Sequence, residues 1–460
     1  MSSNDDVGPG RFEQGSPQDL QEHPKAWYWG VQDKQLSNGQ AWMTLIVLFV
    51  YGFMSMFGFI KVAPVMTVMW DNYGFDLANG GLIQTFYTMS GVLLMFPGTW
   101  LSRKIGLKVT VVMACGISLL GAVVGIFAFD QFTMLLSRTI EGIGAGFIMF
   151  LGANVATRIF PREKLGMAMA VWSIWAPAGV FLALLLSPYF FSWWGLQSLW
   201  VVSAIAYLIC LAWLLVSFKL PKVDENILAL RQSQAASASA EQAGGSSFVQ
   251  KLKTPRVMLI SSLVISASFL IWGFMFGGCV NSFYPTYLTE VKGLDLAGAG
   301  FWPSVISLLT LPLGILAGWL SDKTGTRKWF VTISYLLMAV VMATVAWRED
   351  ADMTAVYIFV VMMSLFSATI PMGTRSAIPE YTPDPKISDY SLTLMVVLGN
   401  LGQAMGVIFG ASVSAFGGGD PALGWQAAGL WLLAPCCLLA GIVTMVFCKN
   451  DLIGKKRRFE

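Results

Sequence analysis

The most regular feature of the chain is a series of long apolar segments separated by short polar ones. These runs continue for about 20 residues or more, whereas half-buried helices and strands alternate with periods near 3.6 and 2. Because a helix needs about 20 apolar residues to cross a bilayer, we predict twelve membrane-spanning helices. Their expected ranges are 42–66, 78–101, 107–129, 131–157, 165–189, 196–218, 257–287, 299–320, 329–347, 353–374, 389–415 and 424–447. Helices are expected because backbone groups in lipid must find their hydrogen-bond partners within their own segment.

Polar segments divide these helices into two groups of six. The stretch 219–256 is rich in small polar residues, such as Gln-Ala-Ala-Ser-Ala-Ser-Ala at 234–240, and is therefore expected to be a flexible linker. The predicted organisation is a polar tail over 1–40, a six-helix bundle over 41–218, the linker, a second six-helix bundle over 257–448 and a basic tail over 449–460.

The placement of basic residues predicts the orientation. Of the 29 Lys and Arg residues, 25 fall in the two tails, the linker and the loops expected on the same side. Only Lys292 and Arg348 fall in the opposite loops, while Lys61 and Arg138 lie inside spans. Because basic loops stay on the cytoplasmic side, we predict a cell-membrane protein whose termini and linker are both cytoplasmic.

Composition narrows the function classes. Hydrophobic residues make up 56% and charged residues 12% of the chain, about half the charge of a soluble domain. This excludes a soluble enzyme, and the net charge of +3 offers no basic patch for nucleic acid. His23 is the single histidine, and the six cysteines lie in apolar stretches without metal-ligand spacing. We therefore expect no metal, cofactor or disulfide framework, and a monomer in contact with lipid and a small-molecule substrate.

Two loops carry a related motif at equivalent places in the two halves. In each, a glycine is followed five positions later by a basic residue, then by a second glycine and another basic residue. The first loop holds Gly98, Arg103, Gly106 and Lys108, with one additional residue before its second glycine; the second loop holds Gly318, Lys323, Gly325 and Arg327. A tight turn between helices needs small residues, and its basic residues hold it on the cytoplasmic side.

A further segment, Arg138-Thr-Ile-Glu141-Gly142-Ile-Gly144, accompanies this pair of loops. Together they resemble the major facilitator superfamily over about residues 40–450. The resemblance implies two six-helix bundles related by a pseudo-two-fold axis, with a binding site between them near the midplane. Segments 168–177 and 398–403 are similar to the cyanate-permease-like branch of that superfamily.

The chain departs from the family pattern in one loop. The family usually has Asp at the fifth position of the loop motif, which is thought to latch one bundle to a helix end of the other. Asp322 is present in the second loop, but Ser102 stands at this position in the first. A neutral hydroxyl interacts less with a helix N-terminus than a carboxylate does, so the resemblance implies a weaker latch there.

Three charged residues within the spans, and Arg375 just after the tenth, are the candidates for transport chemistry, because a charge in a bilayer is costly. Arg138 and Glu141 share one helix face. They either form an ion pair that joins helices or serve transport, with Arg138 facing an anion and Glu141 taking up the coupled proton. Lys61 either extends to the outer interface or faces the cavity and attracts an anion. Arg375, near the end of the tenth helix, is expected to act in gating rather than in direct binding.

Polar and aromatic residues in the spans complete the predicted binding site. The set comprises Gln84, Tyr87, Asn154, Trp172, Trp175, Asn281, Tyr284, Tyr287, Trp302, Asn400 and Gln403. Each could instead serve helix packing or an interhelical hydrogen bond worth about 1 kcal/mol. As a set, rings with few polar groups suit a small, partly apolar ligand.

Small residues form faces on two predicted helices. Gly142 and Gly146 lie on the fourth, and Gly399, Gly402, Gly406 and Gly410 lie on the eleventh. Such faces permit close packing or sliding during transport. Pro177 and Pro312 are expected to bend their helices, which could provide hinges.

These observations favour a secondary transporter of a small organic or inorganic anion, working by alternating access with proton symport. The intramembrane cations Lys61 and Arg138 and the titratable Glu141 support this interpretation. The alternative is an exporter of apolar or aromatic drug-like compounds, suggested by the 13% aromatic content. An exporter of neutral compounds should tolerate Lys61→Ala, whereas an anion carrier should not. The sequence contains no ATP-binding motif or catalytic pair, so neither an ATP-driven pump nor an enzyme is expected.

Overall fold

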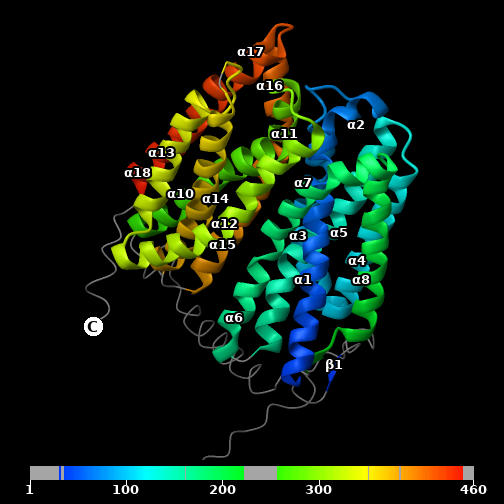
Figure 1. The fold of residues 1–460 in the computed structure, drawn as a ribbon. Coiled ribbons are helices and arrows are strands. Elements are labelled where there is room, and N and C mark those ends of the chain that lie inside the picture. The colour runs from blue at the N-terminus through cyan, green and yellow to red at the C-terminus, as the bar shows by residue number, and fades with distance from the viewer. Residues whose placement is uncertain are drawn as a thin grey trace, which may run out of the picture.

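The computed structural model describes residues 31–32, 36–160, 162–221, 256–350, 352–382 and 385–448. Most of the predicted tails and of the 219–256 linker lie outside these residues. The described chain forms two bundles of six helical crossings each (Figure 1). Nine of the described crossings are long and apolar enough to span a membrane by themselves.

The first bundle contains the first six crossings. They are α1 (Asn38–Ile60) continued by the 3-10 turn η3 (Ala63–Val65) and α2 (Met66–Tyr73), α3 (Leu82–Ile105), α4 (Leu107–Ile126), α5 (Gln131–Ile159), α6 (Arg162–Ser173) continued by α7 (Trp175–Trp194), and α8 (Ser198–Ser217). A short parallel pairing of β1 (Val31–Gln32) with β2 (Leu220–Pro221) joins the two ends of this bundle.

The second bundle repeats the arrangement. Its crossings are α10 (Arg256–Trp272) continued by the π-helix η4 (Gly273–Val280) and α11 (Asn281–Glu290), α12 (Leu296–Thr324), α13 (Lys328–Thr344), α14 (Met353–Tyr381), α15 (Pro385–Ala404) continued by α16 (Gly406–Gly417), and α17 (Pro421–Ala428) continued by the π-helix η5 (Gly429–Leu433) and α18 (Ala434–Phe447). Each bundle has its own buried apolar core.

Several crossings depart from the predicted ranges. The first does not end at residue 66: α1 stops at Ile60 and the helix resumes through α2 to Tyr73. Pro64 causes this interruption, because it lacks the backbone N–H that would bond the Ile60 carbonyl. The tenth crossing continues seven residues beyond the predicted 374, to Tyr381. The fifth is interrupted at Ile174, three residues before Pro177, whereas Pro312 lies within the unbroken α12.

Local chemistry explains where several helices begin and end. Asp130 caps α5 by accepting a hydrogen bond from the Thr133 N–H, and bonds from Thr133 keep the pKa of this carboxyl below its usual value. The second glycine of each paired loop has a positive φ, 92° at Gly106 and 70° at Gly325. Glycine adopts this conformation without steric cost, which explains why both loops turn at that residue.

The two bundles contact each other near the end opposite β1 and α6. There the Thr85 hydroxyl on α3 donates to the Ala404 carbonyl on α15 at 2.6 Å. A Cβ added at Gly410 would lie 2.4 Å from the Leu77 carbonyl oxygen of the other bundle, and one at Gly300 would lie 2.3 Å from the Leu184 carbonyl oxygen. Figure 1 shows the halves converging toward this end and diverging toward the side that holds α6 and β1.

Candidate functional site

The charged residues of the first bundle meet where α1 ends against α5 and α8. Lys61 is the residue that closes α1, and Arg138 and Glu141 lie one turn apart on α5. The Lys61 Nζ lies 2.8 Å from one Glu141 oxygen, and the Arg138 Nη1 lies 2.7 Å from the other. All three side chains are 0% exposed. We call Lys61, Arg138 and Glu141 the ion triad.

The break in the first crossing supplies further partners for Arg138. A helix leaves its last carbonyls without intrahelical donors, and α1 ends just after Gly58 and Phe59. The Arg138 Nη1 donates to the Gly58 carbonyl at 2.8 Å, and Nη2 donates to the Phe59 carbonyl at 2.9 Å. Its Nε donates to the Ile83 carbonyl at 3.3 Å. Arg138 thus joins α1 and α3 to α5.

Two aromatic rings and one hydroxyl enclose the triad. The Arg138 guanidinium lies 4.5 Å from the ring centre of Tyr87, and the Lys61 Nζ lies 4.7 Å from that of Trp200. Such contacts are favourable for a desolvated cation. Lys61 also donates to the Ser203 hydroxyl at 3.1 Å. The Lys61 ammonium thus has Glu141, Ser203 and the Trp200 ring as neighbours.

The triad contains two basic groups and one carboxylate. The structure thus realises the Arg138–Glu141 ion pair, and adds Lys61 to it. The attraction of an anion by Lys61 stays a prediction. Lys61 does not extend to the outer interface in this conformation, because its side chain is 0% exposed and lies against Glu141. The sequence could not show this, since Lys61 and Glu141 lie 80 positions apart.

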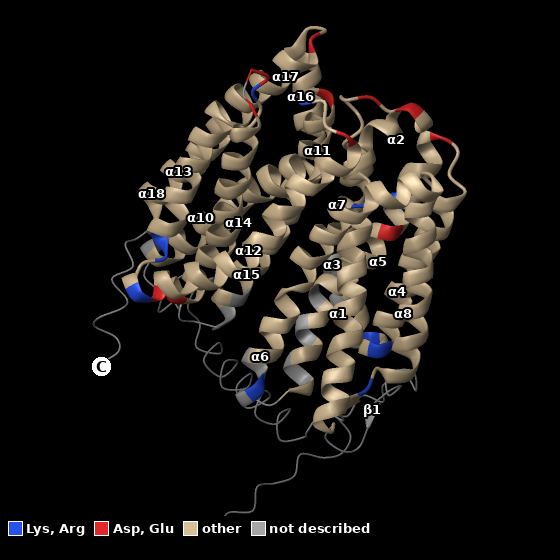
Figure 2. Cartoon of the chain, viewed as in Figure 1, with Lys and Arg blue, Asp and Glu red and all other residues tan. Residues whose placement is uncertain are grey.

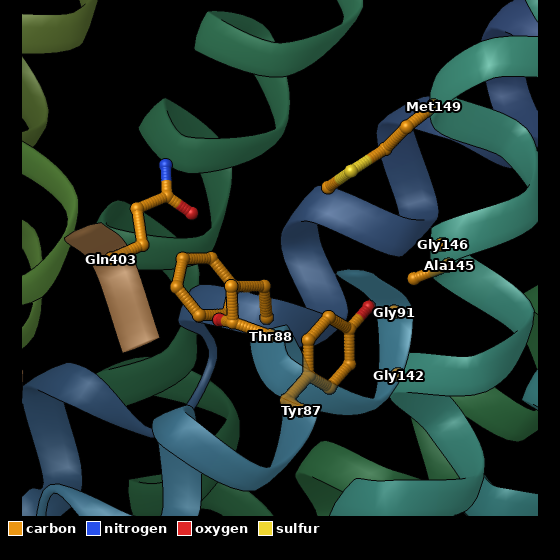
Figure 3. Close-up of a pocket in the computed structure, with 9 residues that line it drawn as sticks. Tyr87, Thr88, Gly91, Gly142, Ala145, Gly146, Met149 and Gln403 are labelled. Atoms are coloured by element: carbon orange, nitrogen blue, oxygen red, sulfur yellow. The ribbon is translucent and has the colours of Figure 1, made fainter. Parts of the chain in front are cut away.

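A small hollow lies beside the triad, between the two bundles. It is lined by Phe59, Tyr87, Thr88, Gly91, Gly142, Ala145, Gly146, Met149 and Gln403. Figure 3 shows Gln403 approaching Tyr87 and Thr88 from the second bundle, with Met149 across the space. Tyr87 belongs to both regions, because its ring lines the hollow and also contacts Arg138.

Glycines set the distance between α3 and α5 beside this hollow. A Cβ added at Gly142 would lie 2.0 Å from the Tyr87 carbonyl oxygen, and one at Gly146 would lie 2.4 Å from the Gly91 carbonyl oxygen. The close-packing interpretation of Gly142 and Gly146 is therefore confirmed. This contact brings Tyr87 against Arg138.

The glycine face on the eleventh crossing also serves close packing. Gly399, Gly402 and Gly406 pack on the seventh crossing, where an added Cβ at Gly406 would lie 2.5 Å from the Gly278 carbonyl oxygen. Gly410 instead meets Leu77 of the first bundle.

Of the predicted binding residues, Tyr87 and Gln403 line the hollow. Trp172 and Trp175 are buried in the first bundle, with their ring centres 5.6 Å apart. The Asn400 amide donates to the Val396 carbonyl of its own helix at 2.8 Å. These last three side chains therefore contribute to packing or helix structure in this conformation.

The other predicted residues occupy different surroundings. Tyr284 and Tyr287 lie in an aromatic cluster of the second bundle, and Asn281 is buried nearby on α11. Trp302 packs against Tyr357. Gln84 is buried on α3, and the Asn154 side chain lies outside the described residues. Sequence reasoning missed Phe59, Thr88 and Met149. Phe59 and Met149 carry no polar group, and a single threonine such as Thr88 is common in membrane-spanning helices.

The structure describes more side-chain contacts for the second of the paired loops than for the first. In the second, Arg327 donates to Asp322, to the Ser321 hydroxyl at 2.7 Å and to Glu380 at 3.3 Å. This arrangement ties the loop to the end of α14, a connection that the sequence analysis did not predict. The first glycine of each loop motif lies within a helix, Gly98 in α3 and Gly318 in α12.

The two remaining gating candidates are Arg103 and Arg375. The Arg103 side chain lies outside the described residues. Arg375 is exposed on α14, six residues before that helix ends at Tyr381.

Comparisons with curated proteins identify transporters at low identity. The chain is 25% identical over 293 residues to "Probable anion transporter 6" of Oryza sativa subsp. japonica, covering 60% of this chain and 66% of that protein. It is 24% identical to "Probable galactarate/D-glucarate transporter GudP" of Bacillus subtilis (strain 168), covering 76% and 80%. It is also 23% identical to "Multidrug resistance protein MdtG" of Klebsiella pneumoniae (strain 342), covering 74% and 78%.

Solved structures share the fold. A D-xylose-proton symporter superposes with a TM-score of 0.72 at 14% identity, over 90% of this chain and 99% of that one. A bacterial homologue of the human lysosomal transporter Spinster, in an inward-facing and unoccupied conformation, superposes with a TM-score of 0.67 at 14% identity over 90% and 96%. The model of the Major Facilitator Superfamily matches residues 48–326 and 274–458. The chain therefore belongs to the Major Facilitator Superfamily of membrane transporters.

Proposed function

We propose that this chain is a secondary active transporter that carries a small organic or inorganic anion across the cell membrane by alternating access, in symport with protons. The observation that carries the proposal is the ion triad, in which two cations surround one carboxylate directly behind the Tyr87 wall of the hollow. A buried surplus of positive charge attracts an anion and repels a cation.

The residues that line the hollow suggest the chemistry of the ligand. Phe59, Tyr87 and Met149 offer apolar contact, while Thr88 and Gln403 offer hydrogen bonds. Gln403 comes from the second bundle, so a ligand held here would touch both halves. We propose a monoanion with a small apolar or aromatic part, and with one or two groups that accept hydrogen bonds.

The distribution of charge supports the proposed orientation. Figure 2 shows most Lys and Arg outside the helix interiors toward the side that holds β1 and α6, and most Asp and Glu toward the opposite side, near α2 and α17. With the basic side in the cytoplasm, the bundle contacts near Gly410 and Gly300 close the outer end. We therefore propose that this conformation faces inward.

Uptake into proteoliposomes tests the proposal. A panel of radiolabelled benzoate, acetate, cyanate and neutral benzamide would be offered with an imposed pH gradient. We expect benzoate to accumulate above its level in protein-free vesicles under the same gradient, benzamide not to do so, and removal of the gradient to abolish this excess. Cyanate in the panel also tests the proposed relation to the cyanate-permease-like branch. Uptake of benzamide with exclusion of every anion would refute the anion proposal.

The apolar lining and the resemblance to "Multidrug resistance protein MdtG" favour a second candidate, export of apolar or aromatic compounds. Lys61→Ala separates the two. An exporter of neutral compounds should keep its transport rate in this variant, because the hollow itself is unchanged. An anion carrier should lose about tenfold or more, since removal of the surplus charge weakens binding by at least 1.4 kcal/mol.

A further inference from the structure

We propose that Lys61, rather than Glu141, gains and loses the proton that couples transport. The inference rests on the proposed anion symport and deepens it, because it names the group whose charge changes. It follows from the partners and the charge balance of the ion triad. The sequence alone favours Glu141 for this role, because a carboxyl group in a membrane span can take up a proton.

Arg138 and Glu141 are both poorly suited to the role. A guanidinium does not lose its proton in proteins. Each oxygen of Glu141 faces a cation, at 2.8 Å from Lys61 and 2.7 Å from Arg138. Neutralising Glu141 would leave two cations together in a site that is 0% exposed, where an unpaired charge is costly. Opposite charges on both sides therefore favour the ionised carboxylate.

Lys61 is the group whose neutralisation balances the triad. When one N–H bond breaks, its electron pair stays on Nζ, and the proton passes to water that enters when the packing around Lys61 opens during the conformational change. The remaining charges are one guanidinium and one carboxylate, which already form a hydrogen-bonded pair. The neutral amine keeps two N–H groups for Glu141 and Ser203, and gives up the donor direction that faces the Trp200 ring.

The surroundings of Lys61 contain few other charges. Glu141 and Arg138 on α5 are the charged groups that act on it among the described residues. The α8 helix contributes Ser203, Trp200 and the Tyr207 hydroxyl, which bonds the Met54 carbonyl at 3.1 Å. The α3 helix contributes Tyr87, whose hydroxyl bonds the Ser55 carbonyl at 2.6 Å. In the described chain, α7, α11 and α12 add no charged group to this set.

This charge balance would couple the proton to the anion. With Lys61 protonated, the triad carries one surplus positive charge, and an anion in the adjacent hollow neutralises it. With Lys61 neutral and the hollow empty, the site is also balanced. The half-loaded states each carry an uncompensated charge, so they are disfavoured during the change between outward and inward conformations. Proton and monoanion would thus cross together.

The ring of Trp200 provides a reporter that needs no substrate. Protonation of Lys61 places a cation over this ring, which alters its fluorescence. We would record tryptophan emission of the purified protein across a pH series and subtract the same series for Trp200→Phe, which isolates the Trp200 contribution. We expect this difference to change with pH in the unsubstituted chain. We expect no such change in Lys61→Met, which removes the proton site, or in Lys61→Arg, which keeps a fixed charge.

A Trp200 signal that titrates equally in the unsubstituted chain and in Lys61→Met would overturn the inference, as would a signal that is constant in both. Lys61→Arg covers the case in which Lys61→Met does not fold, because it retains a cation beside Glu141. If its Trp200 signal titrates as in the unsubstituted chain, the proton site lies elsewhere.

Transport of radiolabelled benzoate tests the coupling separately. Lys61→Arg keeps the positive charge but cannot release a proton, so the ratio of pH-driven accumulation to benzoate exchange, measured in the same vesicles, should fall in this variant. Accumulation driven by a pH gradient should be lost in this variant. Retained accumulation would refute the role of Lys61. Failure of the unsubstituted chain to carry benzoate would instead count against the proposed substrate class, while the Trp200 signal still decides whether Lys61 titrates.

Discussion

The interiors of the two bundles are filled by different kinds of side chain: buried ion pairs in the first and clustered aromatic rings in the second. In the first bundle, the ion triad lies where the first crossing breaks, among carbonyls of α1 and α3 and the rings of Tyr87 and Trp200. The equivalent seventh crossing has a π-helical segment, Gly273–Val280, and contributes two tyrosines to an aromatic cluster. We define this cluster by Tyr284, Tyr287, Trp347, Phe359 and Trp425, in which Trp347 and Trp425 are stacked with ring centres 5.5 Å apart.

The difference indicates a division of roles between halves that share one fold. Ion pairs are directional and depend on protonation, so the first bundle is suited to respond to a proton or to a charged ligand. Aromatic packing depends little on pH and tolerates small shifts between offset and edge-on contacts. A π-helical segment often marks a functional site, and η4 lies at the seventh crossing, beside Gly399 and Gln403 of the eleventh. We therefore expect substitutions in the two interiors to differ in their cost in stability and in how that cost depends on pH.

The largest expected effect is that of Glu141→Gln. It leaves Lys61 and Arg138 unpaired in a site that is 0% exposed, which should lower stability by about 3–5 kcal/mol. The measurement is thermal unfolding of the purified protein in detergent. The matched control is Lys61→Met, which leaves the Arg138–Glu141 pair balanced and should cost far less. Equal unfolding temperatures for the two variants would contradict the charge balance.

In the aromatic cluster, Tyr284→Leu should cost about 1–3 kcal/mol, because the smaller side chain leaves a gap against Phe359, whose ring centre lies 4.3 Å away. The loss should be the same at acidic and alkaline pH. Unfolding measured at two pH values checks this. A cost that varies strongly with pH would show that this interior also depends on a titrating group.

The glycine contacts offer a comparison within the first bundle. Gly146→Ala would place a Cβ 2.4 Å from the Gly91 carbonyl oxygen and should destabilise by about 1–3 kcal/mol. Gly116→Ala on α4 is the control, because nothing lies within 4 Å of its added Cβ. That variant should be neutral or slightly stabilising, since alanine favours helices. A cost as large for Gly116→Ala would mean that helix propensity, not close approach, governs both sites.

The smallest expected effect concerns the paired loops. Glu380→Gln removes one partner of Arg327 at a partly exposed site, and such pairs contribute about 0–1 kcal/mol. We expect an unfolding temperature close to that of the unsubstituted chain and a change in transport rate of a few-fold at most. Stopped-flow uptake into proteoliposomes measures the rate. Complete loss of transport would show that this contact does more than hold the loop.

The fold was largely predictable because hydrophobic length is a local property. The twelve spans, the division into two halves and the resemblance to the superfamily all follow from segments that can be read independently. The errors occurred where one residue alters its neighbours. Pro64 interrupts the first crossing without ending it, and the apolar run Gly273–Val280 gave no sign of a π-helix, since hydrophobic length does not show how many residues each helical turn contains.

The candidate site was only partly predictable. Tyr87 and Gln403 line the hollow as expected, because polar groups within spans tend to meet other polar groups or a cavity. Trp172, Trp175 and Asn400 share those signals but serve packing or bond their own helix. Sequence spacing fixes the helix face only relative to neighbours on the same helix, so it could not distinguish these two groups.

The sequence by itself determined that this chain lies in a membrane as two matched halves, and that very few charges enter the apolar region. It also determined that Arg138 and Glu141 share a face, because helical spacing is fixed by backbone geometry. Only the tertiary structure decided that Lys61 joins them. That contact joins helices far apart in the chain and depends on where α1 breaks, how closely glycines let α3 approach α5, and the cost of leaving any of the three charges without a partner.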